Sequence, residues 1–213
     1  MDVVEVNERA LIVARDWGGI FAPFEAFYIH SIIYSSSRAA DAFQRYEVSR
    51  ALRDTESNQV GCIHEALGHA AALSRFFWPH PRRSMSKQLS RLSQSRAEKL
   101  RRAFGLTEGS ALRDRRLRDL LEHFDERLDS FLLVVEGGYF FPGPRIGDVA
   151  LADEPDGQFF KLVDPVRSCF ACLGEKYYFG DLRMEVDRIV KLAHSMDESG
   201  SRLAKPQAPG TSK

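Results

Sequence analysis

The chain has 213 residues, of which 44% are hydrophobic, and its 30 basic and 30 acidic side chains give a formal net charge of zero. This length and composition predict one globular domain, and the neutral balance excludes a global electrostatic attraction to nucleic acid or membranes. The first ten residues are acidic and no apolar run is long enough to cross a bilayer, so a cytoplasmic protein without a membrane partner is expected. Three cysteines, an odd number, do not predict a disulfide framework.

The first predicted helical region covers residues 19–53, either as one long helix or as two abutting helices. Its hydrophobic side chains recur at helical spacing, and Phe21, Phe24 and Tyr28 follow one face. An aromatic stripe of this kind is typical of a helix that packs in a core. We therefore expect this face to be buried.

Two further helices are expected before residue 105. Residues 59–78 are rich in Gly and Ala, which permit close helix packing, and Pro79 ends this segment. Residues 84–104 predict a more polar helix with a thin apolar line, and Gly105 is a natural stop because glycine tolerates the left-handed conformation that closes a helix.

A longer helix is predicted from about residue 110 to 136, and it has the clearest apolar stripe of the chain. Arg118 and His123 fall outside this stripe, on opposite flanks of the polar face and about 7.5 Å apart along the axis. One copy of the helix therefore makes a poor site for the two side chains acting together. The stripe, expected to face the core, consists of Leu117, Leu120, Leu121, Phe124, Leu128, Phe131, Leu132 and Val135.

The last third of the chain predicts a loop, a short hairpin and a final helix. The Pro-rich residues 139–148 are expected to form the loop, and residues 158–163 and 168–179 the hairpin. The final helix is expected to begin near Asp181, and residues 199–213 to be a disordered tail. Together the elements predict a mainly α fold, an up-and-down helical bundle with a short C-terminal β-hairpin and a final helix, in a single domain over 1–198.

The charged residues are distributed unevenly along the chain. Between Arg75 and Arg118 there are thirteen basic residues against three acidic ones. This run is compatible with a surface that draws a phosphate backbone toward the predicted helix, and equally with an exposed helix whose charges are solvated or paired. The basic residues are at positions 75, 82, 83, 87, 91, 96, 99, 101, 102, 113, 115, 116 and 118.

Two metal-like patterns are interpreted as structural. His64 and His69 are separated by five positions, which rotates their imidazoles by about 140° on a helix and prevents the convergence that zinc-binding histidines need. Cys169 and Cys172 form a single pair with no second pair to complete a four-thiolate site. Neither a metal nor a cofactor is therefore expected.

Arg118 and His123 are residue types suited to phosphate chemistry, and Asp119 lies four residues before His123, within reach to orient its ring. An ordinary solvated helix face would carry the same residue types. The string from Arg118 to His123, an Arg followed by a polar residue and then a His five positions on, resembles the signature of the HEPN superfamily (higher eukaryotes and prokaryotes nucleotide-binding domain). The adjoining EHFDERLD is similar to uncharacterised bacterial members.

The resemblance implies a helical bundle that dimerises with its motif helices near the two-fold axis, so that both copies line one cleft. It also implies metal-independent cleavage of RNA by toxin or defence proteins, with RNA or a nucleotide and sometimes an antitoxin as partners. His123 would be the general acid or base, Arg118 would stabilise the phosphate, and Asp119 would orient His123 or its partner.

Other readings of the same motif remain open. The position at which nucleotide-modified members carry a Tyr is Asp125 here, so that regulatory route is not expected. Acids at 122, 125, 126 and 129 would repel RNA unless the basic run outweighs them. The alternative functions are a non-catalytic nucleotide-binding or helical dimerisation module and a purely structural helical protein.

Overall fold

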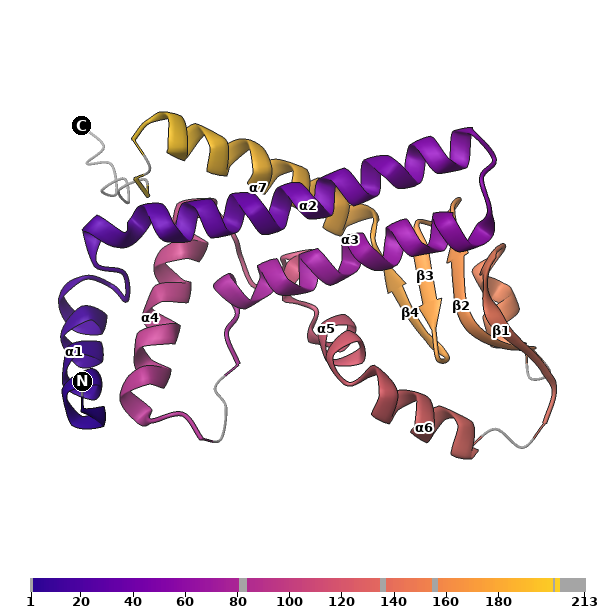
Figure 1. The fold of residues 1–213 in the computed structure, drawn as a ribbon, viewed down its shortest axis with the longest axis horizontal. Coiled ribbons are helices and arrows are strands. Elements are labelled where there is room, and N and C mark those ends of the chain that lie inside the picture. Colours follow the sequence, from indigo (N-terminus) through magenta and orange to yellow (C-terminus); the bar gives the residue numbers. More distant parts are fainter. Residues whose placement is uncertain (1, 81–83, 135–136, 155–156, 201, 204–213) are drawn as a thin grey trace, which may run out of the picture.

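The computed structural model describes residues 2–80, 84–134, 137–154, 157–200 and 202–203, and leaves out the side chains of Arg115 and Arg118. The protein is mainly helical, as predicted (Figure 1). The longer helices are α1 (Val3–Asp16), α2 (Glu25–Ala51), α3 (Glu56–Phe77), α4 (Lys87–Phe104) and α7 (Gly180–Glu198), and the shorter ones are α5 (Arg115–Glu122) and α6 (Phe124–Val134).

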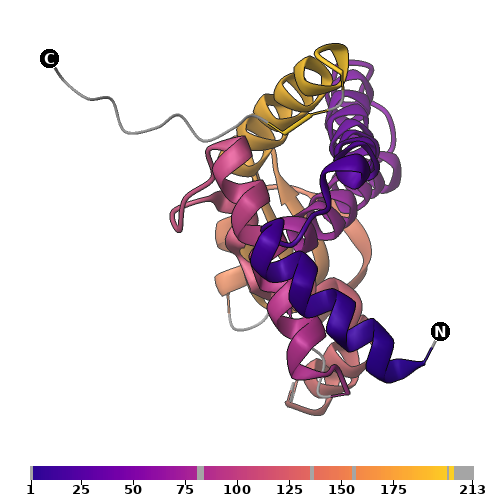
Figure 2. The same ribbon diagram turned by 90° about the vertical axis from the view of Figure 1, so that its left-hand side faces the viewer.

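The helices do not form one up-and-down bundle. Helices α2 and α3 form an antiparallel hairpin, and α7 packs along α2. Helices α1 and α4 pair with each other and run across one end of that layer, as Figure 2 shows from the side. Periodicity identifies helical segments but not the angle at which they cross, so the bundle prediction was wrong in this respect.

The predicted C-terminal ends of α3 and α4 agree with the structure to within one residue, but each helix begins three residues from its predicted start, α3 at Glu56 and α4 at Lys87. Local side chains set these starts. The Thr55 hydroxyl accepts a hydrogen bond from the Asn58 N–H at the start of α3, and the Ser86 hydroxyl accepts one from the Leu89 N–H at the start of α4. Gly105 closes α4 in the left-handed conformation, with φ of 61°.

The core lies between the helical layer and one face of the sheet. Part of the predicted aromatic face of α2 is outside it: Phe24 is exposed and Tyr28 is only half-buried, whereas Phe43 and Tyr46 farther along are fully buried. The largest fully buried side chains are Tyr46, Phe43, Phe77, Phe104, Phe170, Ile20, Ile29, Ile32, Ile63, Leu67, Leu73 and Leu100.

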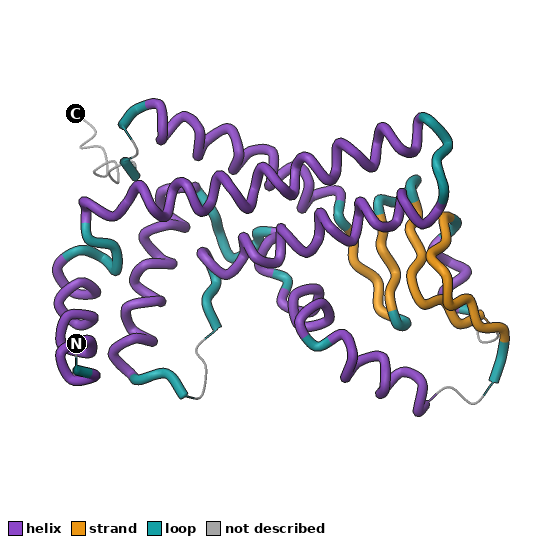
Figure 3. The backbone as a smooth tube through the Cα atoms, in the orientation of Figure 1, coloured by secondary structure: helices purple, strands orange, loops and turns teal. Residues whose placement is uncertain are grey.

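A four-stranded mixed sheet replaces the predicted hairpin (Figure 3). The two antiparallel pairs β2–β3 and β3–β4 extend the hairpin, and β1 adds a parallel edge strand beside β2. The strands are β1 (Tyr139–Ile146), β2 (Gly157–Asp164), β3 (Cys169–Cys172) and β4 (Glu175–Tyr178), in the order β1-β2-β3-β4.

Strand β1 lies where a loop was predicted, and that prediction was wrong. Proline has no N–H to donate to a ladder, so a Pro-rich segment does not resemble a strand. Here Pro142 and Pro144 are tolerated because β1 is at the edge of the sheet and its register shifts between Phe141 and Pro144.

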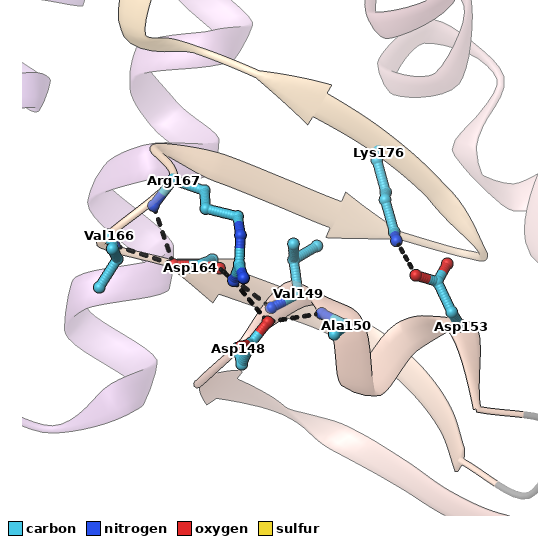
Figure 4. Close-up of polar contacts among 8 residues, drawn as sticks. All are labelled: Asp148, Val149, Ala150, Asp153, Asp164, Val166, Arg167 and Lys176. Atoms are coloured by element: carbon cyan, nitrogen blue, oxygen red, sulfur yellow. Dashed lines mark hydrogen bonds and ion pairs between the residues drawn. The ribbon is translucent and has the colours of Figure 1, made fainter.

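A buried carboxylate fixes the turn between β2 and β3 (Figure 4). Asp164 is 1% exposed and accepts hydrogen bonds from the backbone N–H groups of Val149, Val166 and Arg167. The Arg167 guanidinium donates to Asp164 over 2.8 Å and to Asp148 over 2.6 Å. Burial opposes ionisation, but these donors outweigh it and lower the pKa of Asp164 from 3.8 to about 2.

Asp164→Asn is expected to lower the free energy of unfolding at pH 7 by about 2–4 kcal/mol, because the replacement amide removes the negative charge from a buried site of four donors. The folded-state pKa is depressed, so the contribution of the carboxylate is complete above about pH 4 and is lost as pH falls through about 2. Urea unfolding should therefore show a difference in unfolding free energy between the parent protein and Asp164→Asn that closes over that pH interval.

Asp153→Asn, which breaks the exposed pair with Lys176, is the control and should cost under about 1 kcal/mol. Equal losses in both variants would contradict this role.

Most of the predicted tail, residues 201 and 204–213, lies outside the described residues. The described Leu203 is buried in the core, and its N–H donates to Glu25 over 3.1 Å. The other oxygen of Glu25 accepts a 2.7 Å hydrogen bond from the Lys99 ammonium, which also donates to the carbonyls of Trp17 and Ile20. Glu25 and Lys99 thus join the α1–α2 connection, α4 and Leu203.

Across the described ranges, every helix is too short or too polar to span a lipid bilayer.

Candidate functional site

The predicted motif helix bends sharply at His123. Asp114 caps the start of α5 by accepting from the Arg116 N–H, and α5 ends at Glu122. His123 has φ of −119° and ψ of 39°, outside the helical range, and α6 begins at the next residue. The prediction of a single helix over 110–136 was therefore wrong.

The two sides of the bend pack against different partners. Leu117 and Leu120 of α5 are buried in the core, where α5 meets α3. Phe124 of α6 packs edge-on against Phe160 of β2, with 5.5 Å between ring centroids. A straight helix would keep its apolar stripe on one surface. Because of the bend, α5 can pack against α3 while α6 packs against β2.

His123 lies on the outer surface of the bend. Its side chain is 57% exposed, which agrees with the predicted place on the polar face. Its Nδ1 lies 3.6 Å from a carboxylate oxygen of Glu126, one turn into α6. Asp119 is the residue expected to orient the His123 ring, and the i to i+3 spacing of Glu126 makes Glu126 a second candidate for that role.

Arg118 lies in α5, but its side chain falls outside the described part of the structure. Its two candidate partners are each bound to another arginine: Asp114 pairs with Arg116 over 2.8 Å, and Glu122 pairs with Arg75 of α3. Asp119 is half-buried, and its backbone carbonyl accepts from the His123 N–H over 3.1 Å. The three predicted residues thus share one short segment, and Glu126 is an acidic neighbour of the His123 side chain.

The basic run between Arg75 and Arg118 is partly neutralised. Ion pairing of this kind agrees with the interpretation of a paired, solvated surface and weakens the attraction of the run for a phosphate backbone. Within the described part of the chain, its ion pairs are Arg75–Glu122, Lys99–Glu25, Arg102–Glu98, Arg113–Glu108 and Arg116–Asp114.

A cavity of about 220 Å³ lies beside α5, where α3, β4 and the start of α7 meet. Arg116 lies at its wall, with its guanidinium 5.9 Å from the centroid of the Tyr177 ring. Burial and the neighbouring Glu175 raise the pKa of Tyr177, so its phenol stays protonated and donates to Glu175. Asp114 and Asp181 add acidic groups to the lining.

The metal-like motifs have structural roles. His64 stacks on Phe170 of β3, and burial together with Lys161 lowers its pKa. Cys169 and Cys172 are three residues apart on one strand and therefore face opposite sides of the sheet, in two separate hydrophobic clusters. Burial raises the pKa of both thiols, that of Cys172 to about 12. The residues with described placement contain no cluster of His, Cys, Asp or Glu suited to hold a metal ion.

Leu128 and Phe131 of the predicted stripe pack against the core, but Leu132 at the far end of α6 is exposed, so that part of the prediction was wrong. Leu132 is 52% exposed, Leu133 is 85% exposed and Val134 is 75% exposed, whereas Val135 lies outside the described residues. Tyr139 and Phe140 at the start of β1 are exposed as well. We call Leu132, Leu133 and Val134 the α6 apolar end. Three consecutive exposed apolar side chains are typical of a surface that another protein covers.

Comparisons with protein-family models, with curated proteins and with solved structures found no match to this chain.

Proposed function

We propose that this chain is a metal-independent endoribonuclease of the HEPN-like kind, whose site is completed by a second copy of the chain. The observation that carries the proposal is the exposed His123 at the bend between α5 and α6, with the α6 apolar end at the far end of α6. A solvent-exposed imidazole is accessible to a large substrate, and an apolar surface about 15 Å away along α6 gives a second copy a place to dock.

The chemistry explains why one copy is insufficient. The 2′-hydroxyl of RNA loses its proton to a base and attacks the adjacent phosphorus, the bond from phosphorus to the 5′-oxygen breaks, and an acid protonates that oxygen. The products are a 2′,3′-cyclic phosphate and a 5′-hydroxyl. One neutral His123 can accept the first proton, and a protonated His123 of a second copy can supply the other. Arg118 would offset charge on the phosphoryl oxygens, and Glu126 or Asp119 would orient the ring.

The acidic residues near His123 set a limit on the substrate. Asp125, Glu126 and Asp129 are exposed on α6, and the basic run is partly paired. A long duplex that depends on many phosphate contacts is therefore disfavoured. A short single-stranded segment that contacts few phosphates suits this surface better, as an unstacked strand can enter a narrow cleft between two copies.

The first test is the oligomeric state together with cleavage of a single-stranded RNA in EDTA. We expect the protein to be a dimer in solution and to leave cyclic-phosphate ends. Leu133→Asp should give a monomer with at least tenfold less cleavage and an unchanged circular dichroism spectrum, because Leu133 is 85% exposed in the single chain and its replacement does not disturb the core. Met184→Asp on α7, also at an exposed apolar side chain, is the control and should change neither property.

Two results would count against this function. If RNA stays intact after incubation with the pure dimer, the protein is not an endoribonuclease. If a nucleotide stabilises that dimer against thermal unfolding, a non-catalytic binding module is favoured instead. The cavity beside α5 is the specific observation behind this second candidate, because Arg116 and Tyr177 meet there. Full cleavage by a Leu133→Asp monomer would overturn the composite site but not the activity.

A further inference from the structure

Lys161 of β2 lies in an unusual setting for a lysine. It faces the helices, opposite Cys172 in the ladder, and is only partly exposed. Its ammonium nitrogen lies 5.1 Å from the centroid of the Phe124 ring on α6 and 5.0 Å from that of Phe160. The same nitrogen is 3.3 Å from Nδ1 of His64 on α3. Three separate elements thus hold one ammonium group in place.

No acid of the described residues neutralises this charge within 4.0 Å. In the ladder, Glu175 pairs in register with Cys172 one strand beyond it, so the backbone of Glu175 lies roughly 10 Å from that of Lys161 across two strands. Glu175 already accepts from the Tyr177 hydroxyl and faces Arg127. The other lysine of the sheet, Lys176, pairs with Asp153.

The contacts that Lys161 does make leave donors unused. His64 is held uncharged at neutral pH, because burial and the neighbouring Lys161 lower its pKa, so its Nδ1 can accept one hydrogen bond from the ammonium. The two aromatic faces compensate for part of the lost hydration through cation–π attraction. An ammonium has three N–H groups, and rings accept none of them as strongly as an anionic oxygen does.

We propose that Lys161 forms an oxyanion site that binds the phosphate group of a nucleotide or of RNA, at the junction of β2, α3 and α6. A partly desolvated, pre-positioned ammonium without an acidic partner gains most from an incoming anion, because little side-chain entropy is lost and the local dielectric constant is low. Phe124 follows His123 directly, so a strand bound at Lys161 would run toward the bend of the proposed function. The site itself requires neither a dimer nor cleavage.

Inorganic phosphate is the first probe, compared with chloride at equal ionic strength. We expect saturating phosphate to raise the Tm by about 2–4 °C and to shift the amide resonances around β2 and the start of α6. Lys161→Met keeps the apolar stem but removes the charge and should abolish both effects, and Lys161→Arg should retain them. Lys176→Met is the matched control on the same sheet and should respond as the parent protein does.

The proposed site is contradicted if phosphate changes neither the Tm nor the amide resonances of the parent protein. It is also contradicted if phosphate raises the Tm of Lys161→Met as much as that of Lys176→Met. Circular dichroism of each variant separates a lost site from a lost fold. A mononucleotide and a short single-stranded RNA are then titrated separately into the phosphate-bound protein, and the one that displaces phosphate identifies the source of the phosphate group. If neither displaces phosphate, the assignment of the site to nucleotides and RNA is overturned. Phosphate binding without RNA cleavage would remove the proposed function and leave the Lys161 site intact.

Discussion

His123→Ala is expected to reduce RNA cleavage by about 10²–10⁴-fold without loss of stability. The imidazole is exposed to solvent, and general acid–base catalysis is typically worth this factor. Because the side chain is 57% exposed, its removal creates no cavity and should leave the Tm within about 1 °C. Rates of cleavage at saturating RNA, with the Tm of each preparation, are the measurement.

Mixed dimers make this prediction sharper. If both copies of His123 act in one cleft, a dimer with one parent chain and one His123→Ala chain should be nearly as inactive as a dimer in which both chains carry His123→Ala. If each copy acts alone, the mixed dimer keeps half the activity. His194→Ala, which removes another exposed histidine from α7, is the matched control and should cleave normally. Cleavage that survives His123→Ala would end the case for a catalytic His123.

Gly19→Ala is expected to cost about 3 kcal/mol or more of unfolding free energy. Gly19 has φ of +85°, a conformation that side chains rarely adopt, and a Cβ there would lie 2.1 Å from the backbone nitrogen of Arg96 in α4. That neighbour is backbone, so it cannot move aside without displacing the helix. The expected fall in Tm is about 6–12 °C for a chain of this length.

Gly18→Ala separates the two causes of that loss. Gly18 also has positive φ, at +60°, but its added Cβ would be 3.6 Å from the flexible Lys99 side chain. Gly18→Ala should therefore lower the free energy of unfolding by only about 1 kcal/mol, which is the cost of the left-handed backbone conformation without a steric clash. Gly61 on α3 has open space around it, so Gly61→Ala should stabilise by about 0.5–1 kcal/mol. Similar losses at Gly18 and Gly19 would show that the close approach to α4 is not the dominant effect.

The sequence predicted those features whose causes are local. The end of α4 was predicted from Gly105, which acts within one turn of its own position. The starts of α3 and α4 depend on Thr55 and Ser86 over the same short range, but apolar periodicity placed them three residues away. The exposure of His123 followed from its place on the helical wheel. By contrast, the bend at His123 involves a single non-helical residue and leaves the apolar spacing intact, so periodicity does not reveal it.

Features that depend on distant partners could not be predicted. Strand β1 exists because β2 pairs with it, and nothing within its Pro-rich sequence indicates that partner. Lys161 and His64 are 97 residues apart, and neither stands out alone. Leu132 was predicted to be in the core because it continues the spacing of Leu117 and Leu120, but it is exposed because the chain has turned away by that point. Burial is a property of the assembled fold, which the pattern only suggests.

The contact between Glu25 and Leu203 has a consequence for synthesis. It joins residues 178 positions apart, and α7 packs along α2 over a similar separation. During translation, the apolar face of α2 emerges long before the helix that covers it. Residues 25–51 must therefore wait until residues 180–203 have been synthesised before this part of the core can close, and the apolar face of α2 is exposed to chaperones during that interval.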